Sequence, residues 1–136
     1  MSNVIETLLA IDKNKLELPK KNVKIKRLSD ISQQDVVFTL QGVSQPILEN
    51  IRDAATKINP QTKEVEIDRK QIQYETLLHG IESPNLRDKN LNDHYGVLTP
   101  YDLISKLLLP GEIEALSDQI GDLSGYGENV VEEIKN

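Results

Sequence analysis

The stretch from residue 22 to residue 41, N-V-K-I-K-R-L-S-D-I-S-Q-Q-D-V-V-F-T-L-Q, decides the fold class. Between residues 22 and 28, valine and isoleucine alternate with lysine, which is the period of a half-buried strand. Residues 35–41 are rich in β-branched and aromatic side chains, which favour strands, and Gly42 follows them. We therefore expect two antiparallel strands over residues 22–28 and 35–41, joined by the polar S-D-I-S-Q-Q segment.

The sequence on either side of these strands has the apolar spacing of three and four that is typical of amphipathic helices. Capping residues stand where such helices would begin, and prolines or Gly96 stand where several of them would end. The expected helices cover residues 4–11, residues 46–57, the segment from Asp68 to just before Ser83, residues 86–94, residues 100–108 and residues 110–123, with a loop or a short strand over residues 61–66.

Two strands alone are barely stable in water, so a helical layer has to cover one face of the pair. The sequence thus predicts an α+β fold that is predominantly helical, with a small two-stranded antiparallel β element near the N-terminus. At 136 residues the chain has room for one core. We expect a single globular domain over residues 1–125, followed by an acidic tail over residues 126–136.

The first expected helix, over residues 4–11, places Val4, Ile5, Leu8 and Leu9 on one stripe. Isolated helices shorter than roughly 12–15 residues are marginal in water. This helix therefore has to dock on something, which is either the rest of the chain or a partner.

The formal net charge of -6 is concentrated in one part of the chain. Residues 110–136 carry seven acidic side chains against the single Lys135, while the other 109 residues are balanced. Residues 1–28 carry seven basic and three acidic side chains. The chain therefore runs from a basic beginning to an acidic end, and we interpret the acidic end as the polar face of an assembly surface.

No catalytic, cofactor-binding or metal-binding residue is expected. The absence of cysteine excludes disulfides, thiolate metal sites and cysteine nucleophiles. Neither a glycine-rich phosphate-binding loop nor a nucleophile elbow is present, and His79 and His94 lack the spacing of zinc ligands. Residues 88–99 begin like a calcium loop but lack its glycine and its final glutamate.

A membrane role is not expected either. Uninterrupted aliphatic runs such as residues 107–109 are far short of the roughly 20 residues that span a bilayer. The first residues have no basic region of the kind that opens a secretory signal. We therefore expect the protein to stay in the compartment where it is made.

The cations of residues 20–27 suggest a second class of function, a small nucleic-acid-binding repressor that uses the basic strand. The acidic total and the lack of an aromatic side chain among the lysines argue against it. Lysines on a strand also discourage pairing of its edge, which is the simpler interpretation. Salt-dependent DNA binding in a shift assay would separate the two.

The last expected helix carries the candidate protein-interaction residues. Ile113, Leu116, Ile120 and Leu123 form one stripe, and Tyr126 follows it. An ordinary core helix presents the same stripe, and this alternative is the more common one.

The same segment carries a family resemblance. Residues 106–129, K-L-L-L-P-G-E-I-E-A-L-S-D-Q-I-G-D-L-S-G-Y-G-E-N, and the closing V-V-E-E-I-K-N resemble the C-terminal half of the XkdN-like phage tail assembly chaperones of phages and PBSX-type prophages. Weaker similarity extends through residues 17–20, 51–52 and 83–88, but residues 59–68 show no likeness. Tyr126 stands where the family commonly has phenylalanine.

The resemblance implies a non-enzymatic chaperone that binds the tape measure protein and helps bring the major tail tube protein to it. It implies neither a nucleic acid nor a membrane as partner, and it leaves self-association into a homo-oligomer open. The expected location is the cytoplasm of the bacterial host, with no place in the finished virion. Since such chaperones are often made in two forms by a frameshift, this sequence would be the short form.

Overall fold

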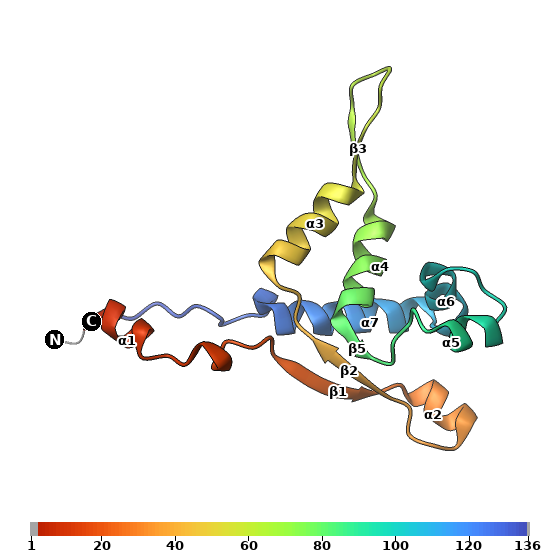
Figure 1. The fold of residues 1–136 in the computed structure, drawn as a ribbon, viewed down its shortest axis with the longest axis horizontal. Coiled ribbons are helices and arrows are strands. Elements are labelled where there is room, and N and C mark those ends of the chain that lie inside the picture. Colours follow the sequence, from red (N-terminus) through yellow and green to blue (C-terminus); the bar gives the residue numbers. More distant parts are fainter. Residues whose placement is uncertain (1–2, 136) are drawn as a thin grey trace.

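The computed structural model describes residues 3–135, which form an α+β fold dominated by helices (Figure 1). The elements follow in the order α1 (Val4–Leu9), η1 (Lys13–Lys15), β1 (Lys20–Lys24), α2 (Lys26–Ser32), β2 (Val37–Gln41), α3 (Gln45–Ala55), β3 (Thr56–Ile58), β4 (Val65–Ile67), α4 (Arg69–Gly80), β5 (Ile81–Ser83), α5 (Lys89–His94), α6 (Pro100–Leu107), α7 (Pro110–Gly121) and η2 (Asp122–Tyr126). The predicted class is confirmed, while the strands are more numerous than predicted and extend beyond the N-terminal part of the chain.

The predicted antiparallel pair is present as β1 and β2, in a register from Lys20 opposite Gln41 to Lys24 opposite Val37. A third strand, β5, pairs antiparallel with the other edge of β2, so the sheet has the order β1-β2-β5. A second, two-stranded sheet is the β3–β4 hairpin. The predicted two-stranded element is therefore corrected to two small sheets.

The segment between β1 and β2 is a helix, not the polar loop that the sequence predicted. The ladder between the strands closes where the Ile25 N–H donates to Val36 O at 3.0 Å. Buried Ser29 holds the connection, because its hydroxyl donates to Ile25 O at 2.8 Å and accepts from the Val36 N–H at 2.9 Å. The alternation of apolar and charged residues continues past the end of β1, because charged residues that are exposed or half-buried begin α2. The sequence pattern therefore does not mark where the strand ends.

Three helices begin at predicted capping residues. The side chains of Asn3, Asp68 and Thr99 each accept a hydrogen bond from a backbone N–H in the first turn, at 2.9 to 3.1 Å. Asp88 caps α5 in the same way at 2.9 Å, and the sequence did not predict this cap. Ser44 lies at the N-cap of α3 but makes no capping bond with its side chain. The expected helix over residues 46–57 is shorter in the structure, because α3 ends at Ala55 and passes directly into β3.

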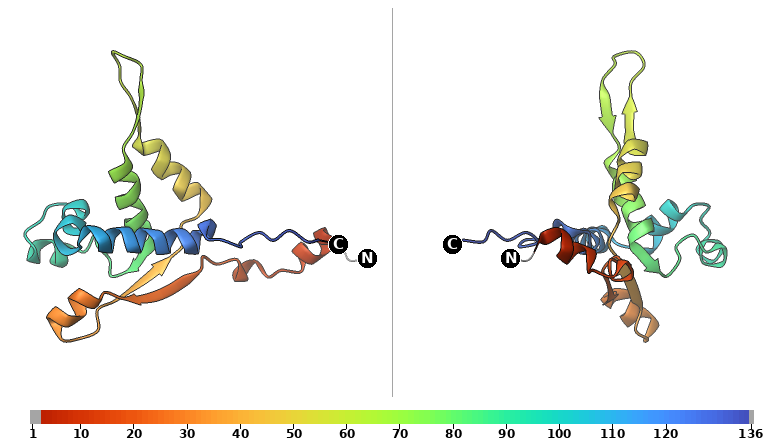
Figure 2. Two further views of the ribbon diagram at one scale, coloured as in Figure 1. Left: turned by 180° about the vertical axis from the view of Figure 1, so that it is seen from behind. Right: turned by 60° about the vertical axis from the view of Figure 1, so that its left-hand side comes forward.

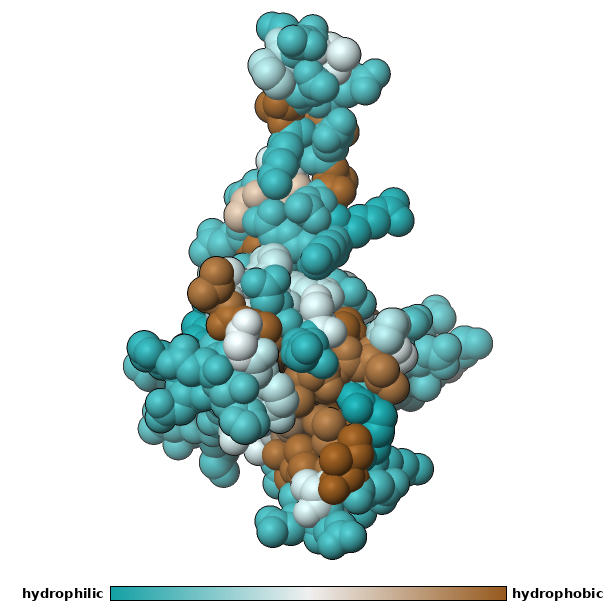
Figure 3. All heavy atoms as spheres, turned by 90° about the vertical axis from the view of Figure 1, so that its right-hand side faces the viewer, coloured by the Kyte–Doolittle hydropathy of each residue, from teal (hydrophilic) through white to brown (hydrophobic). Residues whose placement is uncertain are grey.

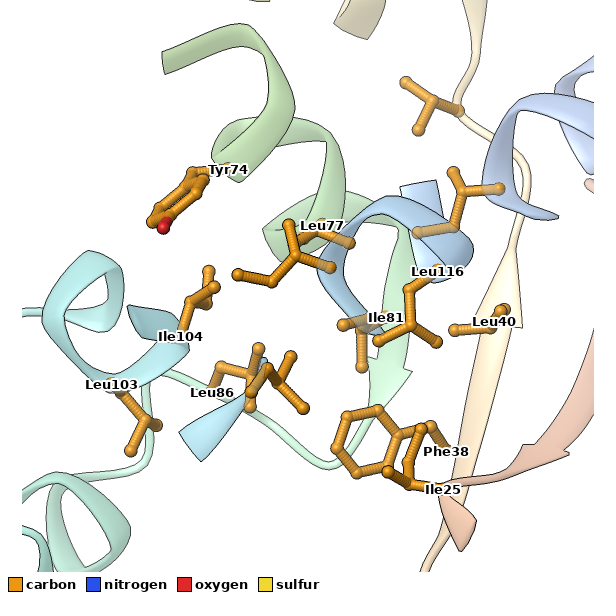
Figure 4. Packing of buried hydrophobic residues seen from close by; sticks show 14 of the residues in the cluster. Ile25, Phe38, Leu40, Tyr74, Leu77, Ile81, Leu86, Leu103, Ile104 and Leu116 are labelled. Carbon is orange, nitrogen blue, oxygen red and sulfur yellow. The ribbon is translucent and has the colours of Figure 1, made fainter. Parts of the chain in front are cut away.

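The core lies where α4, α6 and α7 meet the sheet (Figure 4). Its largest fully buried side chains are Leu40, Leu77, Leu103, Ile104 and Ile120. Helices α4 and α7 cross closely at Gly80, where an added Cβ would lie 2.5 Å from Ile120 Cδ1. This crossing fixes α7 against the body of the protein.

Three segments project from this body (Figures 1 and 2). Residues 3–18, which include α1, and residues 127–135 leave the body on the same side. The β3–β4 hairpin rises from the ends of α3 and α4 in another direction. Every residue from 3 to 22 is exposed.

Candidate protein-interaction surfaces

The predicted interaction stripe on α7 is mostly core. Ile113, Leu116 and Ile120 keep 7%, 3% and 0% of their surface exposed, and they belong to the same buried cluster as Leu77. Leu123 is half-buried at the edge of that cluster. Ile113 and Ile120 are available to a partner only if α7 leaves the body, and Leu116 only touches the wall of the groove described below. An interaction through the predicted stripe on the folded chain therefore stays a prediction, mainly for Leu123 and Tyr126.

Tyr126 is the member of the predicted set that is exposed, at 63%. Its hydroxyl accepts a hydrogen bond of 3.2 Å from Arg52 Nη2, which links the end of η2 to α3. The preceding Ser124 hydroxyl accepts from the Val43 N–H at 2.8 Å. These bonds hold the start of the acidic end against the body and leave the tyrosine ring open to a partner.

An ion pair anchors the beginning of α7. The Arg27 guanidinium donates to both carboxylate oxygens of Glu112, at 2.8 and 3.1 Å, and to Leu107 O at 2.8 Å. Glu112 also accepts the Leu109 N–H at 2.8 Å, so it caps the helix from its third position. These contacts with Arg27 hold the pKa of the Glu112 carboxyl below its usual value, with a smaller contribution from the Leu109 N–H and against the opposing effect of burial.

The basic strand is partly neutralised within the fold. Lys20 pairs with Glu82 at 2.8 Å and Lys24 pairs with Asp35 at 3.2 Å. Together with the Arg27 pair, three of the five cations in residues 20–27 therefore have acidic partners. This leaves little free positive charge for a run of phosphates.

The N-terminal segment is the most apolar of the projecting parts. Its exposed aliphatic residues are Val4 (70%), Ile5 (64%), Leu8 (60%), Leu9 (79%), Ile11 (42%), Leu16 (73%) and Leu18 (39%). Helix α1 is six residues long and buries none of them. A helix this short is not expected to be stable without a partner, so the segment presents an apolar stripe that its own chain leaves uncovered.

The β3–β4 hairpin exposes a second apolar face, which sequence reasoning missed. Ile58 and Val65 are opposite each other in the register, and Ile67 lies two residues further on the same face. All three are 59% to 67% exposed. The base of the hairpin is closed by the Asp68 N–H donating to Ala55 O at 2.8 Å. The alternation V-E-I in residues 65–67 was the available signal, but three residues are too few to distinguish a strand from a loop.

The face that carries α2, α5 and α6 is shown in Figure 3. Apolar side chains gather in its lower part, where α2 lies. Around α2, Ile31 is 70% exposed and Val37 is 47% exposed. Leu98, in the loop before α6, is 97% exposed.

A groove lies between the end of β1 and helix α7. It has a volume of about 290 Å³ and is lined by residues 23–27 on one side and by Glu112, Ala115, Leu116 and Gln119 on the other. Aliphatic side chains form much of its wall, and Lys24 and Lys26 stand among its lining residues.

The titratable residues do not form a metal centre within residues 3–135, where no group of three or more His, Cys, Asp or Glu side chains lies close together. His79 is 3.9 Å from Glu75, and His94 packs edge-on against Tyr95. Tyr101 donates to Glu75 at 2.8 Å, and burial together with this carboxylate raises the pKa of its hydroxyl. Among the described residues, no helix combines the length and the apolar character needed to cross a bilayer.

The sequence and the fold both match known proteins. A sequence model of the family described as "Phage XkdN-like tail assembly chaperone protein" matches residues 5–135. No curated protein matches this chain. A crystal structure described as that of the protein YqbN superposes with a TM-score of 0.65 and 15% identity, over 82% of this chain and 89% of that one. At this identity the likeness establishes the fold alone.

Proposed function

The chain belongs to the phage XkdN-like tail assembly chaperone family, and from this premise we propose that it binds the tape measure protein and helps the major tail tube protein to assemble around it. The family makes it a chaperone and implies tail proteins as its partners. The choice of the tape measure protein as the principal client is the proposal. The action is binding alone, and we propose the cytoplasm of the bacterial host as its location, with no chaperone in the finished virion.

The observation that carries the proposal is the uncovered stripe of the N-terminal segment, residues 3–18. Seven of its aliphatic side chains are 39% to 79% exposed, and exposed apolar side chains gathered in one segment are typical of an interaction site. A tape measure protein presents long amphipathic helices before assembly, and two amphipathic helices can bury their apolar faces against each other. We therefore assign the first contact with the client to this segment.

The total solvent-accessible surface of the chain also supports a role in binding a partner. It measures 10474 Å². A compact monomer of 15.3 kDa exposes about 7,100 Å² by the usual scaling with mass. The excess is larger than the roughly 1,600 Å² that a standard protein–protein interface buries in total.

The acidic end has a separate part in the proposal. Glu128, Glu132 and Glu133 are exposed beside Val130 and Val131. A charged rim around an apolar contact favours the intended partner and keeps the free chaperone from aggregating. We propose that this end, including Tyr126, contributes such a rim.

A pull-down tests the client and the surface together. The tape measure protein encoded in the same tail gene cluster is immobilised, and the chaperone is applied as the wild type and as the double variant Leu8→Ser, Leu9→Ser. Because both leucines are exposed, the variant should fold normally while its retention falls at least about tenfold, as the loss of two buried aliphatic contacts predicts.

The matched control is Leu98→Ser, which removes an even more exposed leucine outside the N-terminal segment. It should be retained like the wild type. Failure of the wild type to bind contradicts the proposed client. Equal loss in the control and in the double variant contradicts the assignment of the surface.

A further inference from the structure

We propose that the acidic tail of one copy of this chain adds as a strand to the free edge of β1 in a second copy, in the groove between β1 and α7. The inference concerns self-association and uses the acidic tail, to which the proposed function gives only a rim around the client contact. Its test measures association of the chain alone, so its outcome is separate from client binding.

The edge of β1 is open. In the order β1-β2-β5, and among residues 3–135, this strand pairs only with β2, so no described strand lies beside its outer backbone groups. Open edges of this kind recruit further strands. The groove lies at the end of this edge, because the last two residues of β1, Val23 and Lys24, line it together with residues 25–27 at the start of α2. Neighbouring residues of a strand point to opposite faces, so Val23 and Lys24 together place the strand backbone on the wall of the groove.

Helix α7 would pack against one side of a strand that entered the groove. Ala115, Leu116 and Gln119 of α7 form its far wall. Val23 and Ile25 provide aliphatic surface on the near wall. A strand in this position would be hydrogen-bonded on one side and packed against a helix on the other, which a bare sheet edge could not provide.

The tail has the chemistry that this site selects. Residues 130–134, V-V-E-E-I, have no regular secondary structure, and every one of them is exposed. As a strand, this segment would have the same length of five residues as β1 and would carry at least one aliphatic and one acidic side chain on each face.

Charge favours the acidic tail over a second β1 edge as the strand that pairs with β1. Lys21 and Lys26 make no ion pair with another described residue, and Lys24 stands at the rim of the groove. A second β1 edge would bring lysines against lysines and would be repelled, whereas Glu132 and Glu133 are attracted. The lysines of β1 therefore repel another basic strand and attract an acidic one.

The course of the tail requires a second copy. The tail leaves the body from η2, next to Gly42, whose N–H donates to Pro19 O at the Lys20 end of β1. The groove lies at the opposite end of β1. From η2 the tail runs away from the body, on the side opposite to α2 (Figures 1 and 2).

A charge exchange tests the pairing in the full chain by sedimentation equilibrium at low salt. The wild type should form dimers or larger assemblies. The tail variant Glu132→Lys, Glu133→Lys and the edge variant Lys21→Glu, Lys26→Glu should each weaken association at least about tenfold. A chain that carries all four substitutions should regain association, because the tail and the edge have exchanged charges and still attract each other.

The control is Lys13→Glu, Lys15→Glu, which makes the same change of charge on exposed lysines far from the groove. It should associate like the wild type. A wild type that stays monomeric at all concentrations, or a combined variant that does not regain association, overturns the proposal.

Cysteine pairing distinguishes a second copy from the same chain, because the sequence contains no cysteine of its own. Chains carrying Lys21→Cys are mixed with chains carrying one cysteine at each position from 130 to 134 in turn, and then oxidised. We expect disulfides between the two kinds of chain, strongest at one tail position. When both cysteines are placed in one chain, a disulfide that forms within monomers overturns the proposal, and so does the absence of any cross-link.

Discussion

At the scale of single residues, Glu112 couples the stability of the fold to pH. Its folded-state pKa is lowered by Arg27 and by the Leu109 N–H. A lowered pKa contributes stability that is fully present above the ordinary glutamate pKa of about 4.3 and is lost as the pH falls through the lower folded value. Acid should therefore loosen the contact between α2 and the beginning of α7.

The variant Glu112→Gln checks this coupling. It keeps an acceptor for the cap but removes the charge, so at neutral pH it should unfold about 1 kcal/mol more easily than the wild type. Between about pH 5 and pH 3 the difference should shrink, because the wild type loses its advantage there. Urea unfolding across this range measures it. A matched Glu114→Gln variant, in an exposed position on the same helix, should show no such narrowing.

Gly80 is the second residue on which the fold depends. Its missing Cβ leaves room for Ile120, whose side-chain atoms would lie 2.5 to 2.8 Å from an added carbon. Gly80→Ala should therefore destabilise the protein by about 1–3 kcal/mol through overpacking of α4 against α7.

The control for this variant is Gly111→Ala, where an added Cβ meets no atom within 4 Å. Alanine favours helix over glycine, so this change should be neutral or slightly stabilising. Thermal unfolding of the two variants gives the comparison. Equal melting temperatures for both would contradict the described crossing of the helices.

At the scale of elements, α7 is a core helix first. The double variant Leu116→Ser, Ile120→Ser should fail to fold, because each substitution empties a buried site at a cost of roughly 2–5 kcal/mol. The sum approaches the whole stability of an ordinary domain. Circular dichroism and proteolysis check this expectation, and a folded double variant that only loses its client would show that α7 is an interface helix.

The sequence predicted the helices well where a cap, a periodic stripe and a stop signal agree, as they do for α4 and α6. It missed β5 because Ile81 continues the apolar stripe of α4, and only the pairing with β2 converts it into a strand. Helix α2 was missed because its sequence prolongs the alternation of β1. In both cases a contact between distant residues overrides a local pattern.

The candidate site shows a different limit. A helix that packs in the core and a helix that binds a partner need the same apolar period of 3.6 residues. The stripe from Ile113 to Leu123 therefore could not reveal which role it has. The N-terminal stripe of Leu8 and Leu9 looked equally ambiguous, and only its exposure in the structure marks it as available to a partner.

At the scale of the whole molecule, the body and the acidic tail should be separable. We keep the predicted boundary between residues 125 and 126 as a proposal. Within residues 126–135, the Arg52 bond to Tyr126 is the side-chain hydrogen bond to the body. Removing residues 126–136 should therefore lower the free energy of unfolding by no more than about 1 kcal/mol.

Urea unfolding and the melting temperature test the truncation. A truncated chain that unfolds would show that the tail belongs to the core. The same truncation should abolish self-association if the tail pairs with β1, while leaving client binding through residues 3–18 largely intact. This pair of results separates the two proposals in one variant.

The three projections have a consequence for how the protein moves through water. A body with long extensions experiences more friction than a sphere of equal mass, so the monomer should diffuse slowly and elute early from a gel-filtration column, near the position of a larger compact protein. Docking the projections against a client would reduce the drag on each chaperone. Binding to the client would then produce a particle that is heavier than the free chaperone and has less friction for its mass.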